Sequence, residues 1–141
     1  MAPRMTVAEL GAFLRSELPS MLGIESFAIE RADGRTCRIR QQFNESMLRP
    51  GGTVSGATLM TLADLAMYVL VLSAIGPVAL AVTTNLNINF LRKGAAGQDL
   101  LAAARLMKLG KRLAVGEVNL FSGTLRDPIA HATATYSIPN T

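Results

Sequence analysis

One carboxylate, Asp64, stands inside an otherwise apolar stretch of the sequence. Burying a carboxylate among leucine and alanine side chains is costly unless its charge is paired or used. No lysine or arginine stands three or four residues away in either direction, although the hydroxyls of Thr61 and Tyr68 do and could bond the acid. Asp64 is therefore a candidate nucleophile or general base. The alternative is a carboxylate held by a partner distant in the sequence.

A glycine-bearing segment, PGGTVSGA at residues 50–57, leads into the same stretch. Glycines at the start of a helix let a substrate approach the backbone closely. The free N–H groups there can polarise a carbonyl or hold a developing oxyanion. Such segments also occur as plain loops that cap a helix. The combination with an acid two turns further along is more informative, because attack on an activated carbonyl needs both groups.

The longest predicted element is an apolar helix over residues 53–76. Gly76-Pro77 ends it, and apart from Asp64 and a few hydroxyls it is apolar all round, which is typical of a helix buried on most sides. The uncharged run 65–82 also approaches the length of a membrane span. The break at Gly76-Pro77 and the strand character after it favour a buried helix. A domain of this size can surround one helix only by wrapping a sheet around it.

A short helix and six strands make up the other predicted elements. Thr6 and Glu9 stand at capping-box spacing and predict an amphipathic helix within residues 1–20 that ends near Pro19. Ala32-Asp33-Gly34 predicts a hairpin turn, and short turns between the later strands mean antiparallel pairing. The expected strands are 27–30, 36–43, 82–91, 100–109, 112–122 and 129–138. The sequence thus predicts an α+β fold with an antiparallel sheet around a central helix.

Composition limits the range of functions. The 141 residues predict one domain, 1–141, and the net charge of +4 suits a small polyanionic ligand but is too diffuse for nucleic acid. The single cysteine, Cys37, excludes an internal disulfide and suits a reducing compartment, and the single histidine, His131, excludes a multi-histidine metal site within one chain. We expect Cys37 buried or half-buried on a strand and His131 on a strand surface. No metal or other cofactor is expected. The N-terminus lacks an apolar run of signal-peptide length, so we expect a cytoplasmic protein without membrane or nucleic-acid partners.

From residue 44 to residue 138 the sequence resembles the hotdog-fold acyl-CoA thioesterases of the phenylacetate-degradation (PaaI-like) type. The motifs that carry the resemblance are PGGTVSGATLMTLAD and the alternating TTNLNINFLRKGAAGQDLLAAARLMKLGKRLAVGEV behind it. The resemblance implies a hotdog fold, in which a strongly curved sheet wraps a central helix. It also implies homodimers with paired sheet edges, which often form homotetramers, and hydrolysis of acyl-CoA to a free acid and CoA.

The resemblance further implies roles for individual residues. Asp64 matches the acid that attacks the thioester carbonyl or activates a water, and Gly56 matches the glycine whose backbone N–H polarises that carbonyl. In the family these groups come from opposite protomers, so each site would lie across the dimer interface. Asn44 would help to orient the water or the thioester. Around the substrate the resemblance places Ser55, Ala57, Tyr68, Thr83, Thr84 and Asn85. Near the CoA phosphates it places Arg92, Lys93, Lys108, Lys111 and Arg112, for which solvated turn charges are the alternative.

The start of the long helix departs from the family pattern. His-Gly-Gly is common there, and this sequence has Ser55-Gly56-Ala57. The donor at Gly56 does not depend on the missing histidine, and we expect Ser55 to cap the helix. The departure leaves a non-catalytic acyl-CoA-binding protein as the alternative function. An acyl-CoA dehydratase is disfavoured, because that chemistry pairs a histidine with an acid and only His131 is available. A purely structural dimerisation module would bind no ligand.

Overall fold

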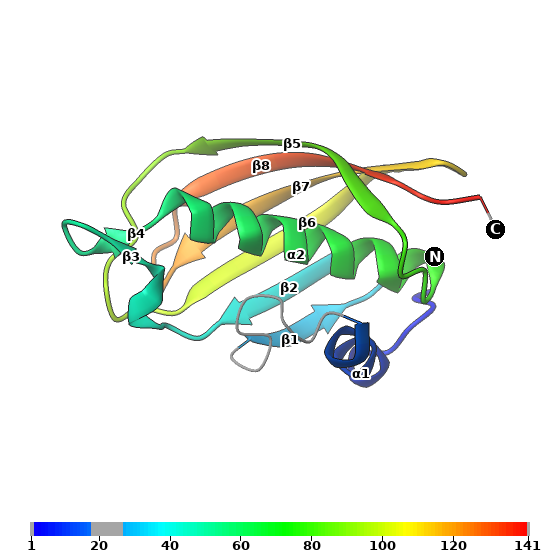
Figure 1. Cartoon of the computed structure of the whole chain (residues 1–141), viewed down its shortest axis with the longest axis horizontal. Coiled ribbons are helices and arrows are strands. Elements are labelled where there is room, and N and C mark those ends of the chain that lie inside the picture. Colours follow the sequence, from blue (N-terminus) through cyan, green and yellow to red (C-terminus); the bar gives the residue numbers. More distant parts are fainter. Residues whose placement is uncertain (1, 18–26, 141) are drawn as a thin grey trace.

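Six strands form one antiparallel sheet that wraps around a long helix. The computed structural model describes residues 2–17 and 27–140. Its elements are α1 (Val7–Glu17), β1 (Phe27–Ala32), β2 (Thr36–Gln41), the 3-10 turn η2 (Glu45–Met47), β3 (Leu48–Arg49), β4 (Thr53–Val54), α2 (Gly56–Ile75), β5 (Val82–Phe90), β6 (Leu100–Leu109), β7 (Leu113–Ser122) and β8 (Ala130–Ser137). The sheet order is β1-β2-β6-β7-β8-β5, and β3 and β4 form a separate hairpin. Figure 1 shows α2 crossing the concave side of the sheet, with β1 and β5 at its edges.

Small residues on the sheet let α2 approach closely. Every residue from Leu65 to Ala74 is buried. A Cβ added at Gly116 on β7 would lie 2.7 Å from the sulfur of Met67, so this methionine packs on bare strand backbone. The helix is long and apolar enough to cross a membrane, but 72% of its apolar window is buried within the protein. The alanines that face it from β6, β7 and β8 are Ala102, Ala104, Ala114, Ala130, Ala132 and Ala134. Its apolar character is thus explained by core packing, as predicted.

Local side-chain hydrogen bonds explain the first helix and the first hairpin. The backbone N–H of Thr6 donates to Glu9 Oε1 at 2.9 Å, and the N–H of Glu9 donates to Thr6 Oγ1 at 3.1 Å. This capping box confirms the predicted start, while the predicted end near Pro19 lies outside the described residues. Between β1 and β2 a carboxylate oxygen of Asp33 accepts the N–H of Thr36 at 2.7 Å and fixes the turn.

The predicted start of the long helix at residue 53 is wrong, because α2 begins at Gly56. Residues 53–54 form β4 and pair with β3 across the Gly51-Gly52 turn, where the two glycines have φ of 103° and 79°. Ser55 is the N-cap, in an extended conformation, and its hydroxyl accepts the N–H of Thr58 at 3.2 Å. The capping role predicted for Ser55 is confirmed.

The two residues that occur once in the sequence lie on strands, as predicted. Cys37 is fully buried on β2, and its thiol donates to the carbonyl oxygen of Ala66 at 3.2 Å. Burial raises the pKa of Cys37 to about 12, so it stays a thiol at neutral pH. His131 on β8 lies with Glu117, at 3.8 Å, on the sheet face that points away from α2. It therefore lies away from Asp64 of the same chain, whereas dehydratase chemistry would require a histidine and an acid at one site.

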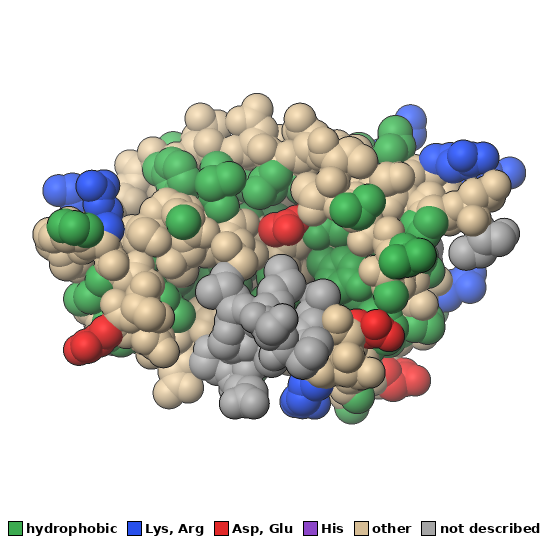
Figure 2. All heavy atoms as spheres, viewed as in Figure 1, with side chains coloured by type: hydrophobic (Ala, Val, Ile, Leu, Met, Phe, Trp, Pro, Cys, Tyr) green, Lys and Arg blue, Asp and Glu red, His purple; other side chains and the backbone are tan. Residues whose placement is uncertain are grey.

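The two edges of the sheet differ. The β1 edge lies next to α1, whereas β5 is an edge strand whose outer side has no strand partner among the described residues. Val82 and Phe90, at the two ends of β5, are 56% and 52% exposed. Figure 2 shows hydrophobic side chains grouped beside this edge and most of the visible Lys and Arg side chains toward the two ends of the molecule. An open edge flanked by exposed apolar side chains is typical of a surface that pairs with another strand.

Candidate active site

Asp64 is held by two hydroxyl groups from the sheet. Its Oδ1 accepts from Thr83 Oγ1 at 2.5 Å and from the Tyr136 hydroxyl at 2.8 Å. Thr83 on β5 and Tyr136 on β8 are paired in register, so the strand pairing brings both donors to one point. No hydrogen bond of Oδ2 and no ion pair of Asp64 is found in residues 2–17 and 27–140. Two neutral donors thus orient the carboxylate through Oδ1, and Oδ2 has no hydrogen-bond partner among the described residues.

The local partners predicted for Asp64 are wrong. The hydroxyl of Thr61 donates to the carbonyl of Ala57 at 3.0 Å, one turn back on α2. The hydroxyl of Tyr68 donates to the carbonyl of Ala79 at 3.0 Å. The actual donors are 19 and 72 residues away in the sequence. Asp64 is therefore held by partners distant in the sequence, and these are hydroxyls rather than a cation.

An open pocket of about 170 Å³ reaches Asp64. The rings of Tyr68 and Tyr136 stack on one another there, with their centroids 6.1 Å apart. Burial, and then the charge of Asp64, raise the pKa of Tyr136 far above its usual range, so its hydroxyl stays a donor at any ordinary pH. The pocket is lined by Asp64, Tyr68, Ala79, Ala81, Val82, Thr83 and Tyr136. Within the described residues, no group of three His, Cys, Asp or Glu side chains could hold a metal ion.

The start of α2 presents free backbone donors beside a larger groove of about 480 Å³. The first N–H groups of a helix have no intrahelical acceptor, and no other bond of the described residues occupies those of Gly56 and Ala57. A Cβ added at Gly56 would lie 3.0 Å from the Phe90 ring, so only a glycine fits here without shifting that ring. The groove is lined by Arg49, Thr53, Val54, Gly56, Leu59, Phe90, Leu91, Arg92 and Lys93.

Gly56 and Asp64 of one chain cannot act on the same bond. They are eight residues apart on α2, which corresponds to about 12 Å along the helix axis. They also belong to separate pockets. A reacting carbonyl needs its acid and its donor at about 3 Å each. A site that uses both groups would therefore take one of them from another copy.

Strand β5 carries a bulge that the predicted alternation missed. Thr83 pairs with Tyr136 and Asn85 pairs with Thr135, so Thr84 is the extra residue. The Thr84 hydroxyl donates to the carbonyl oxygen of Thr135 at 3.2 Å, and Asn85 is exposed. Of the three neighbouring residues predicted for the pocket, only Thr83 reaches Asp64.

Two further predicted residues lie outside both pockets. Asn44 caps η2, where its Oδ1 accepts the N–H of Ser46 at 2.9 Å. Ala57 is exposed on the first turn of α2. Neither lines the pocket of Asp64 or the groove of Gly56. In this chain Asn44 thus has a local structural role, and Ala57 contributes only its free N–H.

The predicted basic residues fall into two groups at opposite ends of the sheet. Arg92 and Lys93 line the groove of Gly56, and the Arg92 guanidinium donates to the carbonyl of Pro128 at 2.7 Å. The second group lies at the turn between β6 and β7, next to the start of β5 in register, and contains Lys108, Lys111 and Arg112. One chain therefore does not gather all five around one ligand.

Two polar residues of these pockets escaped the sequence analysis. Arg49 adds a third cation to the groove of Gly56. Tyr136 follows Ala130, Ala132 and Ala134 on the buried face of β8. A single hydroxyl at the end of a row of buried alanines is the sequence signal that could have identified it.

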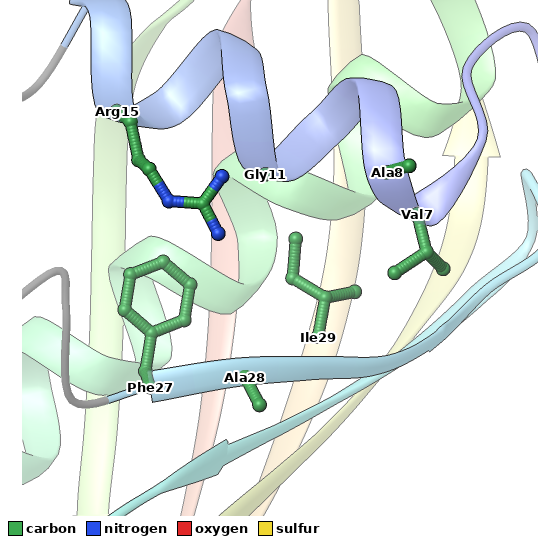
Figure 3. Close-up of a pocket in the computed structure, with 7 residues that line it drawn as sticks. All are labelled: Val7, Ala8, Gly11, Arg15, Phe27, Ala28 and Ile29. Atoms are coloured by element: carbon green, nitrogen blue, oxygen red, sulfur yellow. The ribbon is translucent and has the colours of Figure 1, made fainter.

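A third pocket, of about 390 Å³, lies between α1 and β1 (Figure 3). Its lining side chains include Phe27, Ile29 and Arg15, and none carries a carboxylate or hydroxyl. Among the described residues it therefore lacks the groups that attack a carbonyl.

Comparisons with known proteins agree with this fold. The family model of the thioesterase superfamily matches residues 51–129. A crystal structure named "putative thioesterase" from a Silicibacter species is 44% identical over 99% of this chain and 96% of that chain, with a TM-score of 0.90. The E. coli PaaI protein of the phenylacetic acid degradation operon is 22% identical over 92% and 90%, with a TM-score of 0.72. A hypothetical thioesterase of Streptococcus pneumoniae, solved with coenzyme A, is 21% identical over 94% and 98%, with a TM-score of 0.78. These likenesses confirm the hotdog fold.

Proposed function

Because the chain belongs to the thioesterase superfamily, we propose that it hydrolyses acyl-CoA thioesters to a free acid and CoA. Asp64 attacks the thioester carbonyl or activates a water, and the backbone N–H of Gly56 polarises the carbonyl oxygen. As a base, Asp64 takes a proton from the water whose oxygen attacks the carbonyl carbon. The C–S bond then breaks and CoA leaves as a thiolate. As a nucleophile, Asp64 displaces the thiolate itself, and water then cleaves the resulting anhydride.

The environment of Asp64 is the observation that carries the proposal. A half-buried carboxylate inside an apolar helix lies at an open pocket, with hydroxyls on one oxygen and no cation beside it. A carboxylate with a purely structural role would be paired with a cation or closed off from solvent. The coenzyme A bound to the related Streptococcus pneumoniae protein supports acyl-CoA as the substrate class.

A second copy of the chain completes the site. We propose that two copies pair their β5 strands antiparallel about a two-fold axis, which removes the open edge. The end of one β5, at Phe90, then lies beside the start of the other, at Thr83. Because the Phe90 ring packs on Gly56, Gly56 of the partner subunit approaches Asp64 of the first chain. Each dimer thus has two sites across its interface. Two such dimers form the tetramer.

The same pairing brings the two basic groups together. Arg92 and Lys93 lie at the Phe90 end of β5, whereas Lys111 and Arg112 lie at the Val82 end. Antiparallel pairing places one group from each protomer at the same end of the joined sheet. With Lys108, which belongs to the second group, five cations at each end suit the phosphates of CoA, which lie far from the thioester bond.

Release of free thiol from a panel of acyl-CoAs tests the proposed function. We expect turnover by the purified protein with at least one aliphatic or aromatic acyl-CoA, and none with the corresponding oxygen ester of a simple alcohol, because the thiolate is the better leaving group. Saturable binding without thiol release would instead identify a non-catalytic acyl-CoA-binding protein. If the protein neither binds nor hydrolyses any acyl-CoA, the remaining function is that of a structural dimerisation module.

Mixed dimers test the shared site. We expect Asp64→Ala and Gly56→Pro homodimers to be inactive, and purified mixed dimers to regain about half of the wild-type activity, since each has one intact site and one that lacks both groups. The measurement is the specific activity of protein purified through a different tag on each subunit. A mixed dimer as inactive as its parents would contradict the shared site, as would an active monomer.

A further inference from the structure

The buried hydroxyl of Tyr136 is unusually well placed with respect to Asp64. Tyr136 is only 3% exposed, and its hydroxyl oxygen lies 2.8 Å from Asp64 Oδ1 and 3.1 Å from the backbone carbonyl oxygen of Asp64. Both acceptors belong to the same residue, so the hydroxyl proton has a partner in either position. The contact fixes the side chain of Asp64 relative to its own helix backbone.

The Tyr136 ring is itself held in place. It stacks on Tyr68, whose hydroxyl is anchored to the carbonyl of Ala79. In the sheet, Tyr136 pairs with Thr83 on one side and with Ala114 on the other. The raised pKa of Tyr136 keeps the group a proton donor throughout the pH range of thioester assays. A rigid, protonated phenol is suited to orienting a carboxylate rather than to exchanging protons with it.

We propose that Tyr136 is a positioning residue, which together with Thr83 holds Oδ1 of Asp64 so that Oδ2 faces the reacting thioester. The inference rests on the proposed function. A carboxylate held at one oxygen cannot rotate freely about its terminal bond, so the other oxygen keeps one direction. Tyr136 acts through Asp64 and needs no contact with the substrate. Loss of its hydroxyl leaves the groove at Gly56 and the basic groups unchanged.

Tyr136→Phe is the central variant, because phenylalanine keeps the ring and its stacking. We expect kcat to fall by about ten- to a hundredfold, since small displacements of a reacting group cost rate, while KM stays within about twofold. Thr135→Val is the matched control, since it removes a hydroxyl from the neighbouring residue on the opposite face of β8. We expect this control to keep the wild-type kcat and KM.

A double-mutant cycle separates positioning from general damage. In the Asp64→Asn background, adding Tyr136→Phe should leave the small residual rate unchanged, because the group that it orients no longer acts. In the wild-type background, Thr83→Ser should retain activity and Thr83→Val should lose it, because serine keeps the donated hydrogen bond. Equal losses in the two Asp64 backgrounds would mean a structural role and overturn the inference.

The outcomes distinguish the inference from the proposed function. If wild type is active, Asp64→Asn is inactive and Tyr136→Phe matches wild type, the inference about Tyr136 fails and the function stands. If wild type releases no thiol from any acyl-CoA, the proposed function fails. The inference is then decided by the crystal structure of the Tyr136→Phe, Thr83→Val double variant. An Asp64 side chain that keeps its orientation there would overturn it, and a reoriented one would support it.

Discussion

Replacing Asp64 by asparagine should abolish acyl-CoA hydrolysis while leaving the fold intact. The amide oxygen can still accept from Thr83 and Tyr136, so the local packing survives. The amide neither attacks a carbonyl nor removes a proton from water, so we expect kcat to fall by about a thousandfold or more. The measurement is thiol release under saturating substrate, together with the melting temperature of each protein.

Asp127→Asn is the control for this prediction, because it makes the same chemical change on an exposed loop. It should keep the wild-type rate. A folded Asp64→Asn protein that turns over acyl-CoA at more than a few per cent of the wild-type rate would remove Asp64 from the chemistry. Binding of substrate by the inactive variant, measured by calorimetry, would show that only the chemical step is lost.

Replacing Gly56 by proline should remove the carbonyl-polarising donor with little change in the backbone. Proline is favoured at the first position of a helix, and the preceding Ser55 already has φ −72° and ψ 149°, which a following proline requires. The substitution deletes one backbone N–H. Loss of an oxyanion donor lowers the rate by about a hundredfold to a thousandfold, and we expect kcat of Gly56→Pro to fall in that range.

Gly56→Ala is the steric control for the proline variant. Both substitutions add a Cβ that meets the ring of Phe90, but only alanine keeps the N–H. Since Phe90 is half exposed and can shift, we expect alanine to cost about tenfold at most. The ratio of the two rates isolates the amide. Equal rates for alanine and proline would mean that the Gly56 N–H does not act on the carbonyl.

Short-range patterns predicted most of the fold. The apolar run of α2, the capping box at Thr6 and the turn at Asp33 act through neighbouring residues, and each formed where predicted. The start of α2 was misplaced by three residues. A pair of glycines can precede a helix or form the turn of a hairpin. Here the pairing of β4 with β3, and backbone hydrogen bonds to distant carbonyls such as that from Val54 N–H to Gly94, decide for the hairpin.

The candidate site was predictable only in part. Asp64 was predicted because a carboxylate in an apolar helix is costly to bury unless its charge is paired or used. This apolar context is visible in the sequence. Its partners, Thr83 and Tyr136, depend on the order of β5 and β8 in the sheet and on a bulge. Neither follows from local spacing. The proposed dimer rests on the open edge of β5, which is a property of the order of strands in the sheet and not of local spacing.

The bulge at Thr84 has a consequence for how this protein can change over generations. It divides β5 into two segments. In the first, the facing of the side chains is fixed by the contact of Thr83 with Asp64, and in the second it is fixed by the packing of Leu86 and Ile88 against the core. In a strand without the bulge, the side chains would alternate without interruption along its whole length. A shift of the strand at Asp64 would then also move Leu86 and Ile88 out of the core. Here Val82, which lines the pocket, and Thr84 can vary while Thr83 and the rest of the strand stay in place. Substrate preference can therefore diversify at this short stretch without a loss of foldability.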